Sequence, residues 1–299
     1  MDDTKKSRIA HIELHTAVLL FGISGLFGKL ISASPITIVI GRTAFAAMAI
    51  FIGSRLFSIK LGVAPGKSRY ILPLSGLVLA LHWVAFFHAI QISTVAIGLI
   101  GFATFPVFVT FLEPLVSREK IRAVDVASAL IVMVGLILVA PSFDLSNRGT
   151  IGLIWSVVSG GLFAVLTLLN RYLVKPNSFI VVAFYQHSTA AIVLVPFGFL
   201  LSEFPGSNTI WLLLVLGVFC TAIPQTLFIK SLTALKAQLA SIVAGLEPVY
   251  GIILAAILLG EIPGLSTVIG AILVFAAVVL AIKVHPVSGG NVEKEVEQS

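Results

Sequence analysis

Apolar side chains fill most of the chain in long blocks that short polar stretches separate. A helix needs roughly 20 apolar residues to cross the hydrocarbon core of a bilayer. Ten blocks are close to this length, over residues 14–31, 35–54, 70–90, 93–116, 123–141, 150–171, 178–201, 209–230, 237–260 and 263–284. The pattern therefore predicts an all-α polytopic membrane protein with ten transmembrane helices, joined by connections that are mostly short.

Composition excludes most other classes of protein. Hydrophobic residues make up 58% of the chain and charged residues 11%, whereas soluble domains have about 45–50% and about 25%. A cytosolic enzyme, a disordered chain and a nucleic-acid-binding protein are therefore excluded. The chain has one cysteine, Cys220, which lies inside an apolar block, so we expect no disulfide framework.

The basic residues indicate the orientation in the membrane. Cytoplasmic loops of membrane proteins carry an excess of Lys and Arg. With the N-terminus inside, 16 of the 19 basic residues lie on the inner side, namely Lys5, Lys6, Arg8, Arg55, Lys60, Lys67, Arg69, Arg118, Lys120, Arg122, Arg171, Lys175, Lys230, Lys236, Lys283 and Lys294. We therefore expect both termini in the cytoplasm and an even number of spans.

An internal repeat relates the two halves of the chain. At an offset of 142 residues, Pro106-Val107 recurs as Pro248-Val249, and a glutamate follows thirteen residues after each proline, as Glu119 and Glu261. Apolar helices align by chance, but the two matches together favour a true repeat.

The repeat predicts a division of the chain into two five-helix units, residues 14–141 and 150–284. A cytoplasmic segment, residues 1–13, precedes them, and a cytoplasmic polar tail, residues 285–299, follows them. Because five is an odd number, the second unit enters the membrane from the opposite side. Such inverted repeats around a central cavity are typical of secondary transporters.

These features resemble the EamA-type branch of the drug/metabolite transporter superfamily. Within that branch, residues 79–91, LALHWVAFFHAIQ, resemble the YddG-type amino-acid exporters of bacterial inner membranes. The resemblance implies a cavity between spans one to four and six to nine, with the fifth and tenth spans peripheral. It also implies export of amino acids or related metabolites without ATP, by a multi-pass protein of the bacterial inner membrane.

Polar side chains deep in the apolar windows are candidate substrate contacts, because they are costly in hydrocarbon and usually face the interior of a helical bundle. Arg42 lies in the second window, and Gln186, its counterpart at an offset of 144 residues, lies in the seventh, beside Tyr185. Arg42 either binds a substrate carboxylate or locks the fold through a carbonyl or a helix end. We include Gln186 and Tyr185 among the candidate substrate-binding residues.

Glu247 is the acid near the middle of the ninth window, directly before Pro248. Proline removes a backbone donor and bends a helix, which exposes carbonyl groups. Glu247 either holds a substrate ammonium or a proton, or it pairs with a basic side chain that joins the halves. We add Tyr250 as a substrate contact and predict that Pro106 and Pro248 form helix breaks or hinges.

Three aromatic or imidazole side chains, His82, Trp83 and Phe86, lie near the middle of the third window. Residues four apart share a helix face, so Phe86 lies below His82 and Phe87 below Trp83. The two stripes form either an aromatic wall for an amphipathic substrate or a packed core around a hydrogen-bonded histidine. We include His82, Trp83 and Phe86 in the predicted substrate-binding set.

Several other features are not assigned to the site. We expect a structural role for Lys29, and we expect Glu119 and Glu261 to cap helices or pair with loops. Residues 62–68, GVAPGKS, have three residues between their glycines, whereas a phosphate-binding loop has four. The sequence carries no metal-ligand or cofactor motif, so we predict no metal site, no cofactor and no nucleic-acid partner.

The buried charges favour a zwitterionic substrate. One deep cation, Arg42, and one deep acid, Glu247, fit an amino acid with an apolar side chain, whereas a nucleotide sugar needs several buried cations. We therefore predict a non-enzymatic exporter of aromatic or neutral amino acids and related small metabolites that works by alternating access. The alternatives are a drug or cation efflux transporter, an integral membrane enzyme for lipid-linked substrates, and a channel.

Overall fold

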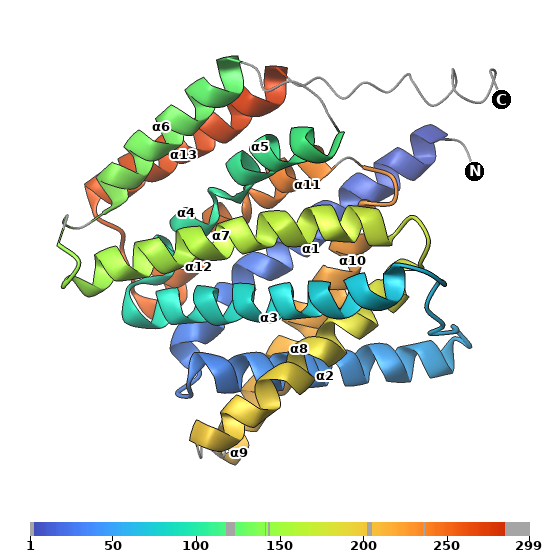
Figure 1. Ribbon diagram of the computed structural model, residues 1–299. Coiled ribbons are helices and arrows are strands. Elements are labelled where there is room, and N and C mark those ends of the chain that lie inside the picture. The colour runs from blue at the N-terminus through green and yellow to red at the C-terminus, as the bar shows by residue number, and fades with distance from the viewer. Residues whose placement is uncertain are drawn as a thin grey trace, which may run out of the picture.

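The computed structural model describes residues 3–117, 123–140, 142, 144–201, 205–235 and 237–284. Within these ranges all regular secondary structure is helical (Figure 1). In chain order the helices are α1 (Asp3–Leu30), α2 (Pro35–Leu56), α3 (Ser68–Ile92), α4 (Val95–Phe102), α5 (Phe105–Ser117), α6 (Ala123–Val139), α7 (Arg148–Leu173), α8 (Phe179–Leu201), α9 (Ser207–Gly217), the π-helix η1 (Val218–Ala222), α10 (Ile223–Ser231), α11 (Ala237–Ala244), α12 (Glu247–Leu259) and α13 (Leu265–Val284).

Seven segments of the described chain are long and apolar enough to cross a membrane. They are Arg8–Leu30, Pro35–Leu56, Ser68–Ile92, Val95–Pro114, Arg148–Leu173, Phe179–Leu201 and Ser207–Ser231. Shorter apolar helices cover Val126–Val139, Glu247–Leu259 and Leu265–Ala277. The chain is therefore a polytopic helical membrane protein, as the sequence predicts.

Local sequence signals set several helix ends. Ser34 caps α2, because its hydroxyl accepts a hydrogen bond from Thr37 N at 3.2 Å, and Pro35 occupies the first helical position, where no donor is needed. Thr94 caps α4 in the same way through Ile97 N at 3.1 Å. Gly260 ends α12 with a φ of 68°, a left-handed conformation that glycine adopts without a side-chain clash.

Three of the predicted windows contain more than one helix. The fourth divides into α4 and α5 just before Pro106, and the ninth divides into α11 and α12 just before Pro248. A proline cannot donate to the carbonyl four residues earlier and its ring clashes with that carbonyl, so each break follows from the local sequence. The eighth window contains the π-helix η1 between α9 and α10.

The helices form a bundle in which contacts join the two halves of the chain. Helix α3 packs on α7 and α8, α1 packs on α10 and α12, α2 packs on α8 and α9, and α4 packs on α7. Helices α6 and α13 pack on each other and lie side by side at one edge of the bundle, away from α2 and α3 (Figure 1). The bundle interior is therefore built by the remaining helices.

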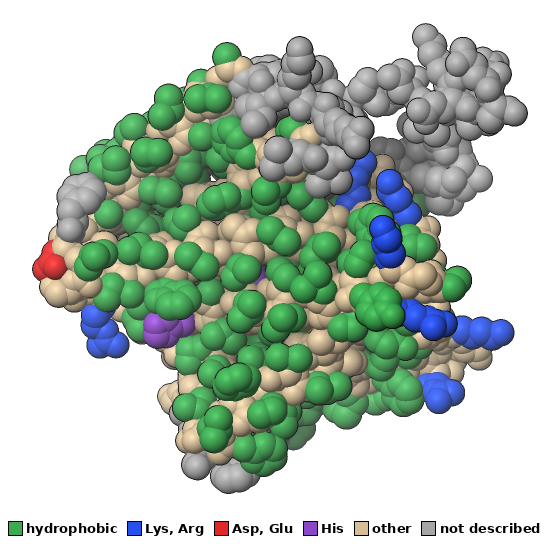
Figure 2. All heavy atoms as spheres, viewed as in Figure 1, with side chains coloured by type: hydrophobic (Ala, Val, Ile, Leu, Met, Phe, Trp, Pro, Cys, Tyr) green, Lys and Arg blue, Asp and Glu red, His purple; other side chains and the backbone are tan. Residues whose placement is uncertain are grey.

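The surface has the pattern of a protein in a lipid bilayer. Apolar side chains cover most of the face in Figure 2, and most of the Lys and Arg side chains visible there gather at one end of the bundle, where the N-terminus lies. We call this the basic end; it includes the connection from α2 to α3 and the C-terminal end of α7. The opposite end is called the far end.

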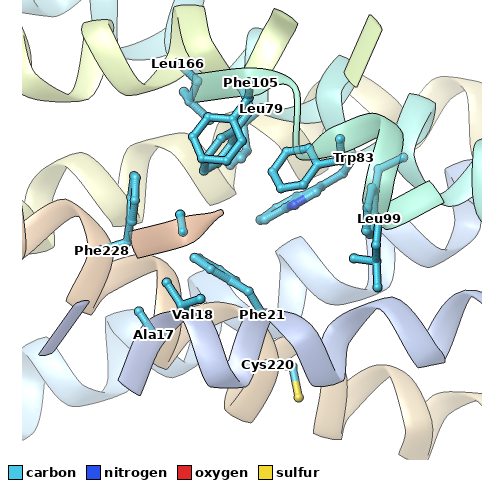
Figure 3. Packing of buried hydrophobic residues seen from close by; sticks show 14 of the residues in the cluster. Ala17, Val18, Phe21, Leu79, Trp83, Leu99, Phe105, Leu166, Cys220 and Phe228 are labelled. Carbon is cyan, nitrogen blue, oxygen red and sulfur yellow. The ribbon is translucent and has the colours of Figure 1, made fainter. Parts of the chain in front are cut away.

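Aromatic rings dominate the centre of the bundle. The centroid of the Phe163 ring lies 5.1 Å from that of Phe105 and 5.5 Å from that of Phe228. The centroids of Phe228 and Phe21 are 6.2 Å apart. Phe21, Trp83, Phe105 and Phe228 surround one central region in Figure 3. These rings come from α1, α3, α5, α7 and α10, so they hold together helices that are distant in the sequence.

Candidate functional site

A small cavity lies in this central region and combines charged, polar and aromatic groups. Its volume open to water is about 20 Å³, and it is lined by Phe21, Ser24, Arg42, His82, Trp83, Phe86, Phe102, Phe163, Gln225 and Glu247. No lining residue is more than 7% exposed. Since a single water already needs roughly 10–15 Å³, the cavity is occluded and has to widen before it can hold a metabolite.

Arg42 is the cation of the cavity, and its guanidinium is only partly satisfied by the protein. Nε donates to Thr221 Oγ1 at 3.0 Å, and Nη2 donates to the Cys220 carbonyl at 3.4 Å. The guanidinium carbon lies 3.8 Å from the centre of the Trp83 ring, in a cation–π contact. Nη1 has no hydrogen-bond partner, so one donor remains available to a ligand.

The hydrogen-bond partners of Arg42 lie in the π-helix η1. One π turn widens a helix locally, and such turns are frequent at functional sites. Thr221 Oγ1 donates to the Leu216 carbonyl at 2.7 Å, a carbonyl five residues earlier, and accepts from Arg42 Nε. The widened turn therefore orients both the Thr221 hydroxyl and the Cys220 carbonyl toward α2.

Glu247 is the acid of the cavity and lies at the start of α12. The N-terminus of a helix carries a partial positive charge that favours an anion. Glu247 and Arg42 line the same cavity, but no carboxylate among the described residues comes within the 4.0 Å of an ion pair with Arg42. The arrangement leaves a carboxylate that forms no ion pair with a described residue and a free guanidinium donor on one cavity.

His82 is held by a neighbouring helix. Its Nδ1 lies 2.8 Å from Ser159 Oγ and 3.1 Å from the Ser159 carbonyl, and Ser159 Oγ also lies 3.2 Å from the His82 carbonyl. These contacts hold the His82 ring, on α3, against α7. His82 is therefore hydrogen-bonded, and it also lines the cavity.

Aromatic rings form the remaining walls of the cavity. The His82 ring centroid lies 4.9 Å from Phe163 and 5.4 Å from Phe102, and Phe86 lies 5.5 Å from Phe102. On its other side, Trp83 stacks on His187 with centroids 5.7 Å apart and the planes inclined by 7°. The walls therefore suit an apolar or aromatic group beside the charged groups.

Five of the eight predicted substrate contacts line this cavity: Arg42, His82, Trp83, Phe86 and Glu247. The other three lie elsewhere. The Tyr185 hydroxyl donates to the Leu61 carbonyl at 3.3 Å. Gln186 Nε2 donates to Ser75 Oγ at 3.0 Å and to Asn170 Oδ1. Tyr250 packs against the core but does not line the cavity.

The cavity also contains residues that the sequence analysis does not identify, namely Phe21, Ser24, Phe102, Phe163 and Gln225. Three of these residues are phenylalanines and one is a small serine, which are common in apolar helices, so the sequence does not single them out. Gln225 follows Pro224 in the eighth window, and a polar amide deep in a hydrophobic span is a signal of the same kind as Arg42. That signal could have identified Gln225.

Two ion pairs connect α1 to the second half of the chain, one toward each end of the bundle. At the far end, Lys29 Nζ lies 3.9 Å from Glu261 and donates to the Ser93 carbonyl at 2.6 Å. Glu261 also accepts from Val95 N, the first residue of α4, at 2.8 Å. At the basic end, Lys230 of α10 pairs with Glu13. Glu119, the other glutamate of the repeat, lies outside the described residues.

A larger hollow, of about 300 Å³, lies between α4, α12 and α13. Its lining is apolar apart from Thr267 and contains neither a charged side chain nor any of the eight predicted substrate contacts. Because recognition of a polar metabolite requires placed polar groups, we assign the candidate site to the smaller central cavity.

Comparison with known proteins identifies relatives along nearly the whole chain. The uncharacterized transporter YxxF of Bacillus subtilis (strain 168) is 26% identical over 286 residues, which cover 93% of this chain and 91% of that protein. An uncharacterized transporter of Archaeoglobus fulgidus is 31% identical over 198 residues, 64% of this chain and 69% of that protein.

The fold has a counterpart among solved structures, and a family model matches the sequence. A crystal structure superposes with a TM-score of 0.70 at 17% identity, over 94% of this chain and 99% of the other. The model of the EamA-like transporter family matches residues 9–140 and again residues 150–283. Since these two matches account for nearly all of the sequence, the chain belongs to the EamA-like transporter family.

Proposed function

We propose that this protein is a secondary transporter that exports amino acids, with a preference for aromatic or neutral side chains. The observation that carries the proposal is the central cavity, where the free Nη1 of Arg42 and the carboxylate of Glu247 lie among aromatic rings, and where Glu247 forms no ion pair with a described residue. Arg42 binds the substrate carboxylate and Glu247 binds its ammonium. The rings of Trp83, Phe86 and Phe163 contact the side chain.

Charge balance supports an amino acid over other metabolites. A zwitterion brings one charge of each sign, which neutralises both the cation and the acid of the cavity without a further ion. A nucleotide sugar or sugar phosphate brings two or more negative charges, and Arg42 is the one cation that lines the cavity in the described chain. Burying a charge without a partner costs several kcal/mol, so phosphorylated substrates are disfavoured.

We further propose that ten membrane-spanning segments form two inverted five-helix repeats. The two matches of the family model support this, because they divide the chain at the same place as the predicted repeats. Helix contacts support it too, because they occur in equivalent pairs. In the first half α3 packs on α7 and α8, and in the second half the α9–η1–α10 segment packs on α1 and α2.

We propose that the basic end faces the cytoplasm of a bacterial cell, with the protein in the inner membrane. The gathering of Lys and Arg at this end supports the orientation (Figure 2). Alternating access then moves the substrate outward, as one repeat rocks against the other. The occluded cavity and the two ion pairs of α1, one on each side of it, suit an intermediate state that is closed to both sides.

Counterflow in liposomes tests the substrate class. Purified protein is reconstituted, loaded with unlabelled amino acid, and assayed with labelled amino acids, their decarboxylated amines and phosphorylated sugars, with and without a pH gradient. We expect saturable exchange of aromatic and neutral amino acids. Exchange of amines alone would instead support a cation efflux transporter, and chemical conversion of a substrate would support an enzyme.

Two variants test the assigned charges in the same assay. Arg42→Ala is expected to raise the half-saturating concentration of phenylalanine by about tenfold or more, because a hydrogen bond to a charged group contributes about 1.5–3 kcal/mol. It should affect phenethylamine, which lacks the carboxylate, much less. Glu247→Gln should reduce flux of both compounds while protein yield stays normal. Wild-type kinetics in both variants would remove these residues from the site.

A further inference from the structure

Gln225 is a fully buried amide whose polar atoms are not used by the protein. It lies in α10 at 0% exposure and lines the central cavity. Neither its Nε2 nor its Oε1 has a hydrogen-bond partner. Burying an amide without hydrogen bonds costs free energy, so the position calls for a ligand that supplies them.

Other buried amides in the described chain have protein partners. Asn177 accepts from Ala64 N at 2.9 Å and donates to Ser68 Oγ at 3.1 Å. Gln186 donates to Ser75 Oγ at 3.0 Å and to Asn170. These residues join helices α3, α7 and α8 near the basic end, and none of them lines the cavity. Gln186 Oε1 and Asn170 Nδ2 also lack a partner, but each of these amides bonds through its other polar atom. Gln225 bonds through neither atom, and it lines the cavity.

The position of Gln225 relative to Arg42 follows from its helix. Thr221, which accepts from Arg42 Nε, precedes Gln225 by four residues, and residues four apart share a helix face. Gln225 therefore lies about one turn from the Arg42 contact, toward the basic end where α10 finishes. The cavity thus contains two donors without a partner, Arg42 Nη1 and Gln225 Nε2, and one acceptor without a partner, Gln225 Oε1. It also contains the Glu247 carboxylate, which forms no ion pair with a described residue.

An α-amino acid is the complement of this set. Its carboxylate and ammonium are attached to one carbon, and the donor and acceptor of a carboxamide are likewise attached to one carbon. A carboxylate has two oxygens, so one can accept from Arg42 and the other from Gln225. The neighbouring ammonium has three N–H donors, enough for both Gln225 Oε1 and Glu247.

We propose that Gln225 recognises the α-amino-carboxylate group of the substrate, with Nε2 on the carboxylate and Oε1 on the ammonium. This inference rests on the proposed function, because it assigns a further contact at the same site. It makes Gln225 a specificity-determining residue: α-amino acids satisfy both of its atoms, whereas an amine satisfies only the acceptor. A β- or γ-amino acid separates the two charged groups and satisfies the amide less well.

The test compares phenylalanine with phenethylamine in counterflow, using full-length protein in liposomes. Gln225→Glu keeps an acceptor but replaces the donor with a negative charge, so it should raise the half-saturating concentration of phenylalanine by about tenfold or more. The same variant should bind phenethylamine as well as the wild type does, or better. Gln225→Met has a side chain of similar size but apolar. It should raise the half-saturating concentration of phenylalanine by about the same factor, and that of phenethylamine by less.

Thr226→Val is the matched control. Thr226 is the next residue, its hydroxyl is also buried without a partner, and it does not line the cavity. We expect wild-type kinetics from this variant. If Gln225→Met does not fold, as judged by yield and gel filtration, Gln225→Asn provides the same comparison with a shortened amide.

Different failures have different meanings. Equal kinetics for wild type and the Gln225 variants on phenylalanine would overturn the inference and leave the proposed function intact. An equal loss for phenylalanine and phenethylamine in Gln225→Glu would also overturn it, since a merely structural residue affects both substrates alike. A wild-type protein that exchanges no amino acid would refute the proposed function itself, before any variant is compared.

Discussion

Arg42 makes the contacts of a structural residue and keeps one donor for the proposed binding role. Two of its nitrogen atoms bond to Thr221 and to the Cys220 carbonyl, and its plane lies on Trp83, whereas Nη1 is free. The bonded atoms fix the direction of the guanidinium, and the free one is presented to the cavity. A rigidly held side chain loses less conformational entropy when it binds a ligand, so the structural contacts serve the proposed binding role.

The Thr221 hydroxyl is expected to maintain this orientation. Thr221→Val removes the acceptor of Arg42 Nε and leaves a buried charged donor unpaired, which should lower the free energy of unfolding by about 1–3 kcal/mol. Thermal unfolding in detergent measures this change. The half-saturating concentration of phenylalanine should rise as well, because Arg42 loses its fixed direction. Thr221→Ser keeps the hydroxyl and should restore both values; a defect equal to that of valine would contradict the role of the hydrogen bond.

The sequence identifies the charged residues of the cavity better than the neutral ones. Arg42 and Glu247 stand out in hydrocarbon, since a charge there must have a partner or a function. Tyr185, Gln186 and Tyr250 are neutral polar residues that also lie within predicted windows, but they lie outside the cavity. Helices that are apolar on all faces carry no periodic signal that tells which face points inward. The direction of these side chains therefore depends on helix packing.

Two broken helices shape the cavity at the scale of the element. The break before Pro248 makes Glu247 the first residue of α12, where the partial positive charge of the helix end favours its carboxylate. The equivalent break before Pro106 lies between Phe102, which lines the cavity, and Phe105, whose ring stacks on Phe102 with centroids 5.1 Å apart. Both breaks follow from a residue type that the sequence displays directly.

Joining the ninth window into one helix should impair transport. Pro248→Ala supplies the missing backbone donor, favours a continuous helix, and removes the helix end from Glu247. We expect flux to fall by about tenfold, the effect of roughly 1.4 kcal/mol, at normal yield. Counterflow measures it.

Pro196→Ala is the control for this change, because Pro196 lies on an exposed face of α8 where the helix continues through it. It should leave flux unchanged. Equal flux in Pro248→Ala and wild type would show that the break has no role in transport.

Helix boundaries are predicted less completely than helix positions. The apolar windows give the location of the helices, and the prolines give two of the breaks. The π turn of η1 also precedes a proline, Pro224, the second residue of α10, which cannot donate to the Cys220 carbonyl. This proline predicts an irregularity in the eighth window but not its π geometry. That geometry depends on contacts with α2, and Arg42 supplies the hydrogen bonds that the widened turn leaves available.

At the scale of the whole molecule, the arrangement of charge and helices supports a defined orientation. The connections at the basic end are exposed and rich in Lys and Arg, whereas the far end carries few basic groups in the visible face (Figure 2). Lys29, at the far end, is occupied by Glu261 and the Ser93 carbonyl. Hydropathy and charge along the sequence predict this distribution without knowledge of the helix contacts.

Cysteine labelling tests the orientation and the inverted repeat together. Cys220 is buried and contributes only its carbonyl to Arg42, so Cys220→Ala gives a background without thiols. In intact cells a membrane-impermeant maleimide should label Leu145→Cys and Gly264→Cys. It should label Lys60→Cys and Lys175→Cys only after the cells are opened. Labelling of Lys60→Cys and Lys175→Cys on different sides of the membrane would contradict the proposed topology.

The π turn has a consequence for the way a ligand is held. A site between two symmetric halves would bind a ligand equally well in two opposite orientations. Such a site would not distinguish one end of the ligand from the other. Here the widened turn interrupts α9–η1–α10, while α3, its proposed counterpart, is continuous. Arg42 and Glu247 likewise have no charged counterparts at Gln186 and Phe105. The central cavity is therefore asymmetric, and in the proposed transport cycle it would accept a substrate in a single orientation.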